Sequence, residues 1–137
     1  NNDMDHITDS SEIPMKKVCG VYEVDCAINN LPLKFIFDTG ASSVSISSVE
    51  ASFMLKNGYL SENDIKGKEY YSVATGEIRE GTIIRLREIR VGDAILKNVE
   101  ASVAHNQKAP LLLGQSVLER FGTITIDNKN SKLIIKQ

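Results

Sequence analysis

Residues 35–43 read Phe-Ile-Phe-Asp-Thr-Gly-Ala-Ser-Ser, so an apolar run leads directly into the acidic side chain of Asp38. The apolar run predicts a strand over residues 33–37 that ends where Asp38 begins. Gly40 permits backbone angles that other residues avoid, and the small residues after it let a second backbone approach closely. The tripeptide alone supports two interpretations: a carboxylate placed for chemistry, or an Asx turn in which Asp38 accepts local N–H groups.

Short strands and turns surround this stretch. Residues 21–28 have a strand pattern, and a turn at Asn29-Asn30 joins them in a hairpin to strand 33–37. Many short strands with regular turns predict an all-β fold, a small closed or partly open β-barrel. The remaining strands are expected over residues 43–47, 70–73, 81–91, 94–103, 111–113, 123–126 and 132–136.

One or two short helices complete the predicted fold. The first covers residues 48–56, with Ser48 as its N-cap and Gly58 just beyond its end. The second covers residues 115–121, before the closing hairpin. Residues 61–64, which read Ser-Glu-Asn-Asp, form a weaker helix start.

Length and composition fit one ordinary domain. The chain has 137 residues, of which 42% are hydrophobic, and its net charge is -2. Residues 1–14 are polar and aperiodic, which predicts a disordered leader before a domain over residues 15–137. The charge argues against nucleic acid as the main partner, and no run of about 18 apolar residues could span a membrane. The chain begins at Asn1 without an initiator methionine, so its location stays open, including export to the periplasm or cell envelope by an upstream signal.

The cysteines and histidines are not expected to form a disulfide or a metal site. Cys26 lies on the predicted strand over residues 21–28, and Cys19 lies just before that strand. Their Cα atoms should therefore be roughly 20 Å apart, at about 3.3 Å per residue. A disulfide needs Cα atoms within about 7 Å, so both thiols should be free. His6 falls in the leader and His105 in a polar loop, where both should be solvated. Neither histidine is placed to act as a base for a nucleophilic Ser42.

A second apolar segment adds to the evidence from the tripeptide. Leu112-Leu113-Gly114 lies far along the chain and is followed by the predicted helix over residues 115–121. With Asp38-Thr39-Gly40, a flap-like hairpin around residues 74–77 and a closing hairpin, the chain resembles the retropepsin-like aspartic proteases, including the single-domain versions found in bacteria. The pieces occur in the family's order from about Lys16 to the C-terminus, and this order is more specific than any single motif.

The resemblance implies a role for each segment. Asp38 would be the catalytic residue, and Thr39 would brace the site by reaching the facing loop of a partner. Gly40 would let the two loops approach each other. The other implied residues are Ala41 and Ser42 as loop support, Leu112, Leu113 and Gly114 as a strand behind the loop, and Ala74, Thr75, Gly76 and Glu77 as the tip of a flap over the substrate.

Hydrolysis by this family needs two carboxylates, and the chain supplies one. One carboxylate takes a proton from water while the other, protonated, polarises the scissile carbonyl. The sequence has no second apolar-apolar-Asp-Ser/Thr-Gly segment, since Ile126-Asp127 runs into a hairpin turn. The prediction is therefore an aspartic endopeptidase active as a homodimer, in which each copy gives one Asp38. Its substrate would be a peptide or protein, with no metal or cofactor.

Some features leave alternatives open. Ser42 stands where retroviral members commonly carry an aspartate, which leaves the contacts of the substrate pocket undecided, while Gln115 should have little effect. Residues 48–67 form an insert that is either a pocket wall or a surface cap. One rival function is a retropepsin-like peptide-binding or dimerisation module that no longer cleaves, which the intact Asp38-Thr39-Gly40 argues against. Another is an unrelated ligand-binding β-barrel, which the Leu112-Leu113-Gly114 segment argues against.

Overall fold

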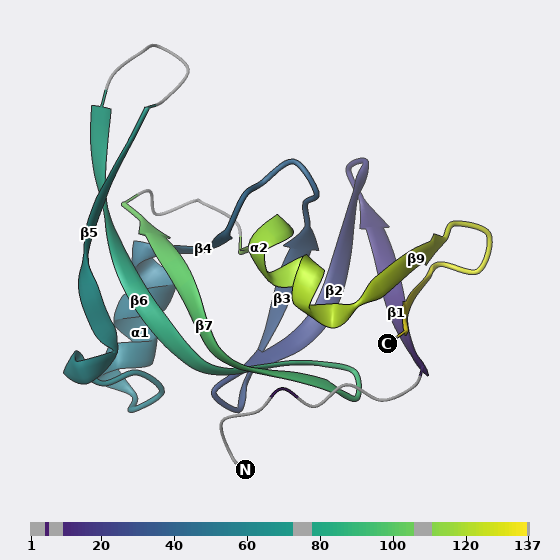
Figure 1. Cartoon of the computed structure of the whole chain (residues 1–137), viewed down its shortest axis with the longest axis horizontal. Helices are drawn as coiled ribbons and strands as arrows, with labels where there is room; N and C mark the ends of the chain where they lie inside the picture. The colour runs from purple at the N-terminus through teal and green to yellow at the C-terminus, as the bar shows by residue number, and fades with distance from the viewer. Residues whose placement is uncertain (1–4, 6–9, 73–77, 106–110, 137) are drawn as a thin grey trace.

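The computed structural model describes Asp5 and residues 10–72, 78–105 and 111–136. These residues form mostly strands, with short helices at two places (Figure 1). The strands are β1 (Ser10–Val18), β2 (Val21–Ile28), β3 (Leu31–Phe37), β4 (Val44–Ser47), β5 (Ile65–Ser72), β6 (Ile78–Val91), β7 (Ala94–Ala104), β8 (Leu112–Leu113), β9 (Thr123–Asp127) and β10 (Lys132–Lys136). The α-helices are α1 (Ser48–Lys56) and α2 (Gln115–Leu118), and the 3-10 helices are η1 (Glu62–Asp64) and η2 (Glu119–Phe121).

All ten strands belong to one sheet, in the order β5-β6-β7-β4-β8-β3-β2-β1-β10-β9. An additional pairing joins β6 to β2, at Ala27↔Arg90 and Ile28↔Ile89, and so links six strands into a ring. The all-β expectation with short helices is confirmed. The predicted barrel takes the form of this ring, with β5 and β9 left as the two edges of the sheet.

The core lies between the faces of the folded sheet. Phe35, Leu86 and Leu96 come from different strands and are fully buried, and Phe121 from η2 joins them. Each such side chain contributes about 1.5–3 kcal/mol relative to an exposed position. In the described part of the chain, no helix is long and apolar enough to cross a membrane.

The structure differs from the sequence prediction in the segment that was predicted as a leader. The disordered leader was expected to reach residue 14, but β1 begins at Ser10, and Ser10–Pro14 pair with β10. Ser11, Ile13 and Met15 alternate toward the interior and are buried. The partner strand lies at the other end of the sequence, so the local composition gave no sign of this pairing.

The α1 boundaries agree with prediction except at the cap. Ser47, rather than Ser48, is the N-cap, and its hydroxyl accepts the Glu50 N–H at 3.1 Å. Ser47 ends β4 with an extended backbone, so its hydroxyl can turn back to the first helical turn. The helix ends at Lys56, and Gly58 follows with a positive φ of 80°.

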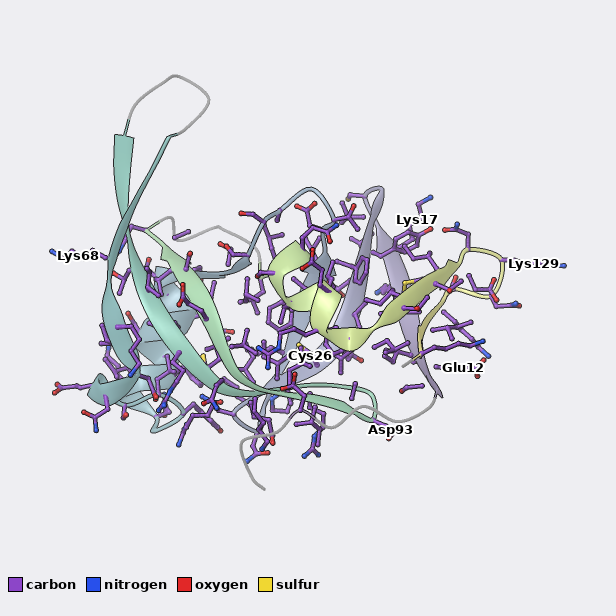
Figure 2. All side chains as sticks on the ribbon, in the orientation of Figure 1. Glu12, Lys17, Cys26, Lys68, Asp93 and Lys129 are labelled. Carbon is purple, nitrogen blue, oxygen red and sulfur yellow. The ribbon has the colours of Figure 1, made fainter. Side chains whose placement is uncertain are left out.

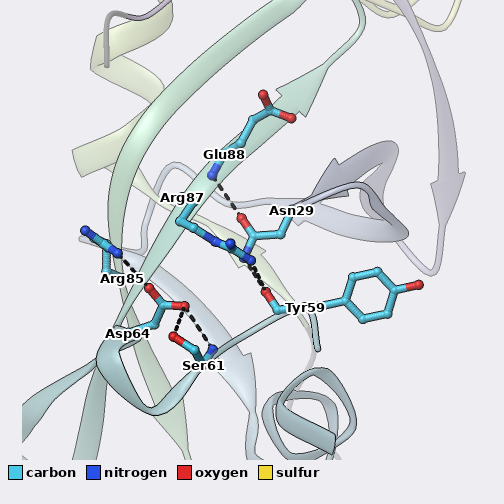
Figure 3. A network of polar contacts seen from close by, with 7 residues as sticks. All are labelled: Asn29, Tyr59, Ser61, Asp64, Arg85, Arg87 and Glu88. Atoms are coloured by element: carbon cyan, nitrogen blue, oxygen red, sulfur yellow. Dashed lines mark hydrogen bonds and ion pairs between the residues drawn. The ribbon is translucent and has the colours of Figure 1, made fainter. Parts of the chain in front are cut away.

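The insert over residues 48–67 is fastened to the sheet by polar contacts (Figure 3). The Tyr59 carbonyl oxygen accepts from Asn29 Nδ2 at 2.7 Å and from Arg87 Nη2 at 3.0 Å. In η1, which the sequence predicted as a weak helix start, Asp64 Oδ2 accepts the Ser61 N–H at 3.0 Å. Asp64 Oδ1 lies 2.9 Å from Arg85 Nη2.

Asp64 is the buried acid of this network, with 1% of its surface exposed. Burial alone raises the pKa of Asp64, but the hydrogen bond from Ser61 and the Arg85 guanidinium outweigh burial and hold the pKa below its ordinary value. The ionised carboxylate therefore stabilises the folded insert.

Both cysteines are free, as expected. Cys19 is exposed in the turn between β1 and β2, while Cys26 faces the interior from β2 (Figure 2). The Cys26 thiol donates to the Leu33 carbonyl oxygen at 3.5 Å. Burial, with a smaller contribution from the charge of Asp25, raises the pKa of the Cys26 thiol and makes that thiol unreactive.

Candidate active site

Strand β3 carries the chain into Asp38, and β8 holds it there. The two strands are parallel, with Ile36 opposite Leu112 and Phe37 opposite Leu113. The Ile36 N–H donates to the Leu111 carbonyl oxygen at 2.8 Å. One step on, the Asp38 N–H donates to the Leu113 carbonyl oxygen at 3.1 Å. The backbone of Asp38 is thereby fixed as an extension of the ladder.

Strand β8 also contacts the far side of the loop, because it lies between β3 and β4 in the sheet. Leu112 is opposite Ser45 of β4 in an antiparallel pair. The loop over residues 38–43 therefore leaves the sheet on one side of β8 and returns on the other. The structure brings together the two segments, Asp38-Thr39-Gly40 and Leu112-Leu113-Gly114, that the sequence singled out.

Gly114 is the point of closest approach between these segments. A Cβ atom at this position would lie 2.4 Å from the Ser43 carbonyl oxygen and 2.7 Å from that of Ala41. Directly after Gly114, the Gln115 N–H donates to the Ala41 carbonyl oxygen at 2.8 Å. The Ser116 N–H donates to that of Ser42 at 2.9 Å. Ala41 and Ser42 thus hold the loop through their backbone carbonyls.

The Asp38 side chain is oriented within its own loop. Its Oδ1 accepts the Gly40 N–H at 2.9 Å, and its carbonyl oxygen accepts the Ala41 N–H at 3.2 Å. This is the Asx-type turn that the sequence allowed, so the turn exists together with the strand support from β8. Asp38 is partly buried, whereas Thr39 and Gly40 are exposed. The carboxylate is therefore fixed in direction while its loop remains accessible.

Gln115 is a site residue that sequence reasoning missed. It was expected to have little effect, yet its Nε2 donates to the Thr39 carbonyl oxygen at 3.1 Å. The Gln115 backbone N–H also donates to the Ala41 carbonyl oxygen, so Gln115 connects the start of α2 to the loop at both Thr39 and Ala41. Its position in the sequence could have indicated this role. Gln115 carries amide N–H donors and directly follows Leu112-Leu113-Gly114, the segment expected to lie behind the loop.

The remaining predicted residues fall into two groups. The flap tip, Ala74, Thr75, Gly76 and Glu77, lies outside the described residues, although β5 and β6 pair on either side of it up to Ser72↔Ile78. His105 is exposed at the end of β7, where its Nε2 lies 3.2 Å from the Thr82 hydroxyl. Its exposure agrees with the solvated histidine that was expected.

Two hollows lie near these elements. We call the first the loop–β9 hollow; its volume is about 260 Å³, and it is lined by Phe37, Thr39, Gln115, Leu118, Glu119, Gly122, Ile124 and Ile126. It lies between the loop over residues 38–43, α2 and β9. The second, of about 160 Å³, lies between α1 and the sheet, where Ala51 and Leu55 face Ile84 and Val103. Residues of the insert therefore line one side of this second hollow.

Known proteins resemble this chain in sequence and in structure. A family model described as gag-polyprotein putative aspartyl protease matches residues 24–120. An uncharacterized protein from Rickettsia prowazekii (strain Madrid E) is 33% identical over 108 residues, which cover 79% of this chain and 44% of that protein. The chain thus spans less than half the length of this relative. The crystal structure of a retropepsin-like aspartic protease from Rickettsia conorii has a TM-score of 0.65 at 25% identity, covering 96% of this chain and 90% of that chain.

Proposed function

This chain belongs to the retropepsin-like aspartic proteases, and on that premise we propose that it is an aspartic endopeptidase active as a homodimer. Each copy supplies one Asp38, and the two carboxylates activate a water molecule for hydrolysis of a peptide bond. The homodimer follows from the chemistry, because the sequence holds a single Asp-Thr-Gly segment.

The way in which Asp38 is held is the observation that best supports this function. A hydrogen bond from the Asp38 N–H to the Leu113 carbonyl oxygen fixes the backbone of Asp38. A second hydrogen bond, from the Gly40 N–H to Asp38 Oδ1, fixes the carboxylate. Such fixing from two sides keeps a reactive group at a set position before substrate arrives. Asp38 nevertheless stays only partly buried, so a second carboxylate can approach it.

In the proposed mechanism, the two carboxylates lie about 3 Å apart and share one proton, because both cannot be ionised at that separation. The ionised Asp38 takes a proton from water as the water oxygen attacks the scissile carbonyl carbon. The protonated Asp38 donates to the carbonyl oxygen and stabilises the tetrahedral intermediate. Transfer of a proton to the leaving nitrogen then breaks the C–N bond and yields a carboxyl and an amine product.

The substrate would be a peptide in an extended conformation. Strand-like backbone pairing would supply much of the binding, and apolar pockets would select side chains. The β5–β6 hairpin, with its tip at residues 74–77, is the proposed flap that covers the peptide and excludes water.

A cleavage assay with a mixed peptide library at acidic and neutral pH tests the proposal. Asp38→Asn keeps the shape of the side chain but removes its acid–base chemistry, and Asp38→Ala removes the group. Both should lower cleavage by about 10²-fold or more. Cleavage that survives either substitution would contradict the role of Asp38, and peptide binding without cleavage by the wild type would favour the non-cleaving module.

A further inference from the structure

Asp5, which precedes β1 in the sequence, is attached to the domain by a compact set of polar contacts. Its Oδ1 accepts the backbone N–H of Lys97 at 2.7 Å. Arg120 contacts both carboxylate oxygens, with Nη2 at 2.6 Å from Oδ1 and Nε at 3.1 Å from Oδ2. Arg120 Nη2 also donates to the Lys97 carbonyl oxygen at 2.6 Å. We call Asp5, Lys97 and Arg120 the Asp5 clasp.

The clasp completes one edge of β7. This strand pairs with β6 over most of its length, but with β4 only from Ala101 to Ala104. At Lys97 the edge that faces away from β6 therefore has no strand partner among the described residues. Asp5 accepts the Lys97 N–H, and Arg120 donates to the Lys97 carbonyl oxygen. The two side chains thus satisfy the backbone groups that a neighbouring strand would otherwise satisfy.

The chemistry of the clasp requires a carboxylate at Asp5. Arg120 presents two nitrogens in the forked geometry that carboxylates accept, and charge-assisted pairs of this kind are stronger than neutral ones. The ammonium group of Lys97 is engaged elsewhere, since its Nζ lies 2.8 Å from Glu88 Oε1. The side chains of Arg120 and Asp5 are 34% and 28% exposed, so water screens the attraction only in part. An amide at this position would keep the shape and lose the charge.

Arg120 connects the clasp to the candidate active site. It lies in η2, which continues directly from α2. At the other end of this α2–η2 segment, Gln115 and Ser116 donate hydrogen bonds to the loop over residues 38–43. Rigid helical elements of this kind carry a displacement from one end to the other. The segment that holds the loop is therefore itself held by Asp5.

We propose that Asp5 is a positioning residue, which fastens the N-terminal segment to the domain and, through Arg120, holds the α2–η2 segment against the loop that carries Asp38. Release of Asp5 loosens this segment, so the hydrogen bonds from Gln115 and Ser116 open more often. The clasp itself is independent of the proposed function, whereas its effect on peptide cleavage rests on that function.

A double-mutant cycle with Asp5→Asn and Arg120→Gln in the full chain tests the clasp. Asp5→Asn should raise the equilibrium constant for urea unfolding by about fivefold in the wild-type background and leave it nearly unchanged in the Arg120→Gln background. The control is the same cycle with Glu23→Gln and Lys34→Gln, whose looser ion pair spans 3.7 Å and should give a coupling of less than about twofold. Equal effects of Asp5→Asn in both backgrounds would overturn the clasp.

Hydrogen exchange of single amides, followed by NMR in wild type and Asp5→Asn, tests the positioning role. The N–H groups of Gln115 and Ser116 should exchange about fivefold faster in Asp5→Asn, because the clasp no longer opposes their local opening. The Met15 N–H, which donates to the Ser131 carbonyl oxygen at 2.9 Å, should keep its rate. Unchanged rates at α2, or the same acceleration at all three amides, would overturn the positioning role.

Peptide cleavage by the same proteins separates this inference from the proposed function. Asp5→Asn should lower kcat by about twofold or more with little change in KM, because a loosely held carboxylate affects the chemical step more than substrate binding. Glu23→Gln should keep both constants. An unchanged kcat in Asp5→Asn would show that the clasp does not reach the active site. If the wild type itself does not cleave, the proposed function is wrong, and the exchange rates still decide the role of Asp5.

Discussion

Gly114 and Ser43 are so close that a Cβ atom on the glycine would lie 2.4 Å from the serine carbonyl oxygen. This backbone contact joins the residue after β8 to the end of the loop that carries Asp38. Bonds from Gln115 and Ser116 to Ala41 and Ser42 continue the contact. The position of the proposed catalytic carboxylate thus depends on a segment more than half the chain away.

Gly114→Ala should destabilise the protein, because the added methyl group must push two backbone segments apart. Overpacking of this kind costs about 1–3 kcal/mol in the free energy of unfolding, and urea unfolding measures it. Ser116→Ala is the matched control, since Ser116 is exposed on α2 and alanine favours a helix. Equal stability of the two variants would show that the contact is looser than described.

Asp64→Asn should lower the free energy of unfolding at neutral pH by about 1–3 kcal/mol, because it removes a charged acceptor from Arg85. The folded-state pKa of Asp64 is depressed, so its contribution is full above the ordinary value of about 3.9 and is lost as pH falls through the folded pKa. The difference in the free energy of unfolding between wild type and Asp64→Asn should therefore decrease as the pH falls below about 4.

The control for this series is Glu62→Gln, which removes an exposed acid from the same 3-10 helix. It should leave stability nearly unchanged across the same pH range. If the difference in the free energy of unfolding between wild type and Asp64→Asn stays constant down to acid pH, the assigned ionisation of Asp64 is wrong.

A thiol reagent should modify one cysteine quickly in the native protein. Cys19 is exposed, whereas burial raises the pKa of Cys26 and shields its sulfur. The fast phase should vanish in Cys19→Ser, and both thiols of the wild type should react after unfolding in urea. A fast native reaction in Cys19→Ser would show that β2 opens readily or that Cys26 is not buried.

Thr39→Ala should weaken the proposed dimer, because the hydroxyl is expected to bond to the facing loop of the partner. Two symmetry-related bonds worth about 0.5–1.5 kcal/mol each would raise the dimer Kd by about tenfold. Thr39→Ser keeps the hydroxyl and should restore most of the affinity in sedimentation equilibrium. Equal affinities for the two variants would argue that the threonine hydroxyl makes no contact across the axis.

Much of the fold was visible in the sequence because local patterns specify it. The apolar run before Asp38 predicted β3, and the residues from 48 to 56 gave α1 with an error of one residue at its cap. The start of β1 at Ser10 was missed because its partner, β10, lies at the opposite end of the chain. Long-range pairing of this kind leaves no local signature in a polar segment.

The site was predictable in its segments but not in its contacts. Asp38-Thr39-Gly40 and Leu112-Leu113-Gly114 were identified by residue type and order, and the structure brings them together. The hydrogen bond from the Gln115 side-chain amide to the Thr39 carbonyl oxygen could not be predicted, because it depends on the direction of a side chain at the start of α2. The loop–β9 hollow likewise appears only when α2, β9 and the loop are placed side by side.

Subunit mixing tests the central claim, that one active site needs an Asp38 from each of two chains. Wild-type and Asp38→Asn chains are mixed in equal amounts above the dimer Kd, at constant total concentration, and allowed to exchange. Random pairing leaves about one quarter of the dimers with two aspartates, so the cleavage rate should fall to about one quarter of the all-wild-type rate. A rate of about one half, proportional to the wild-type chains, would mean that each chain works alone and would contradict the account.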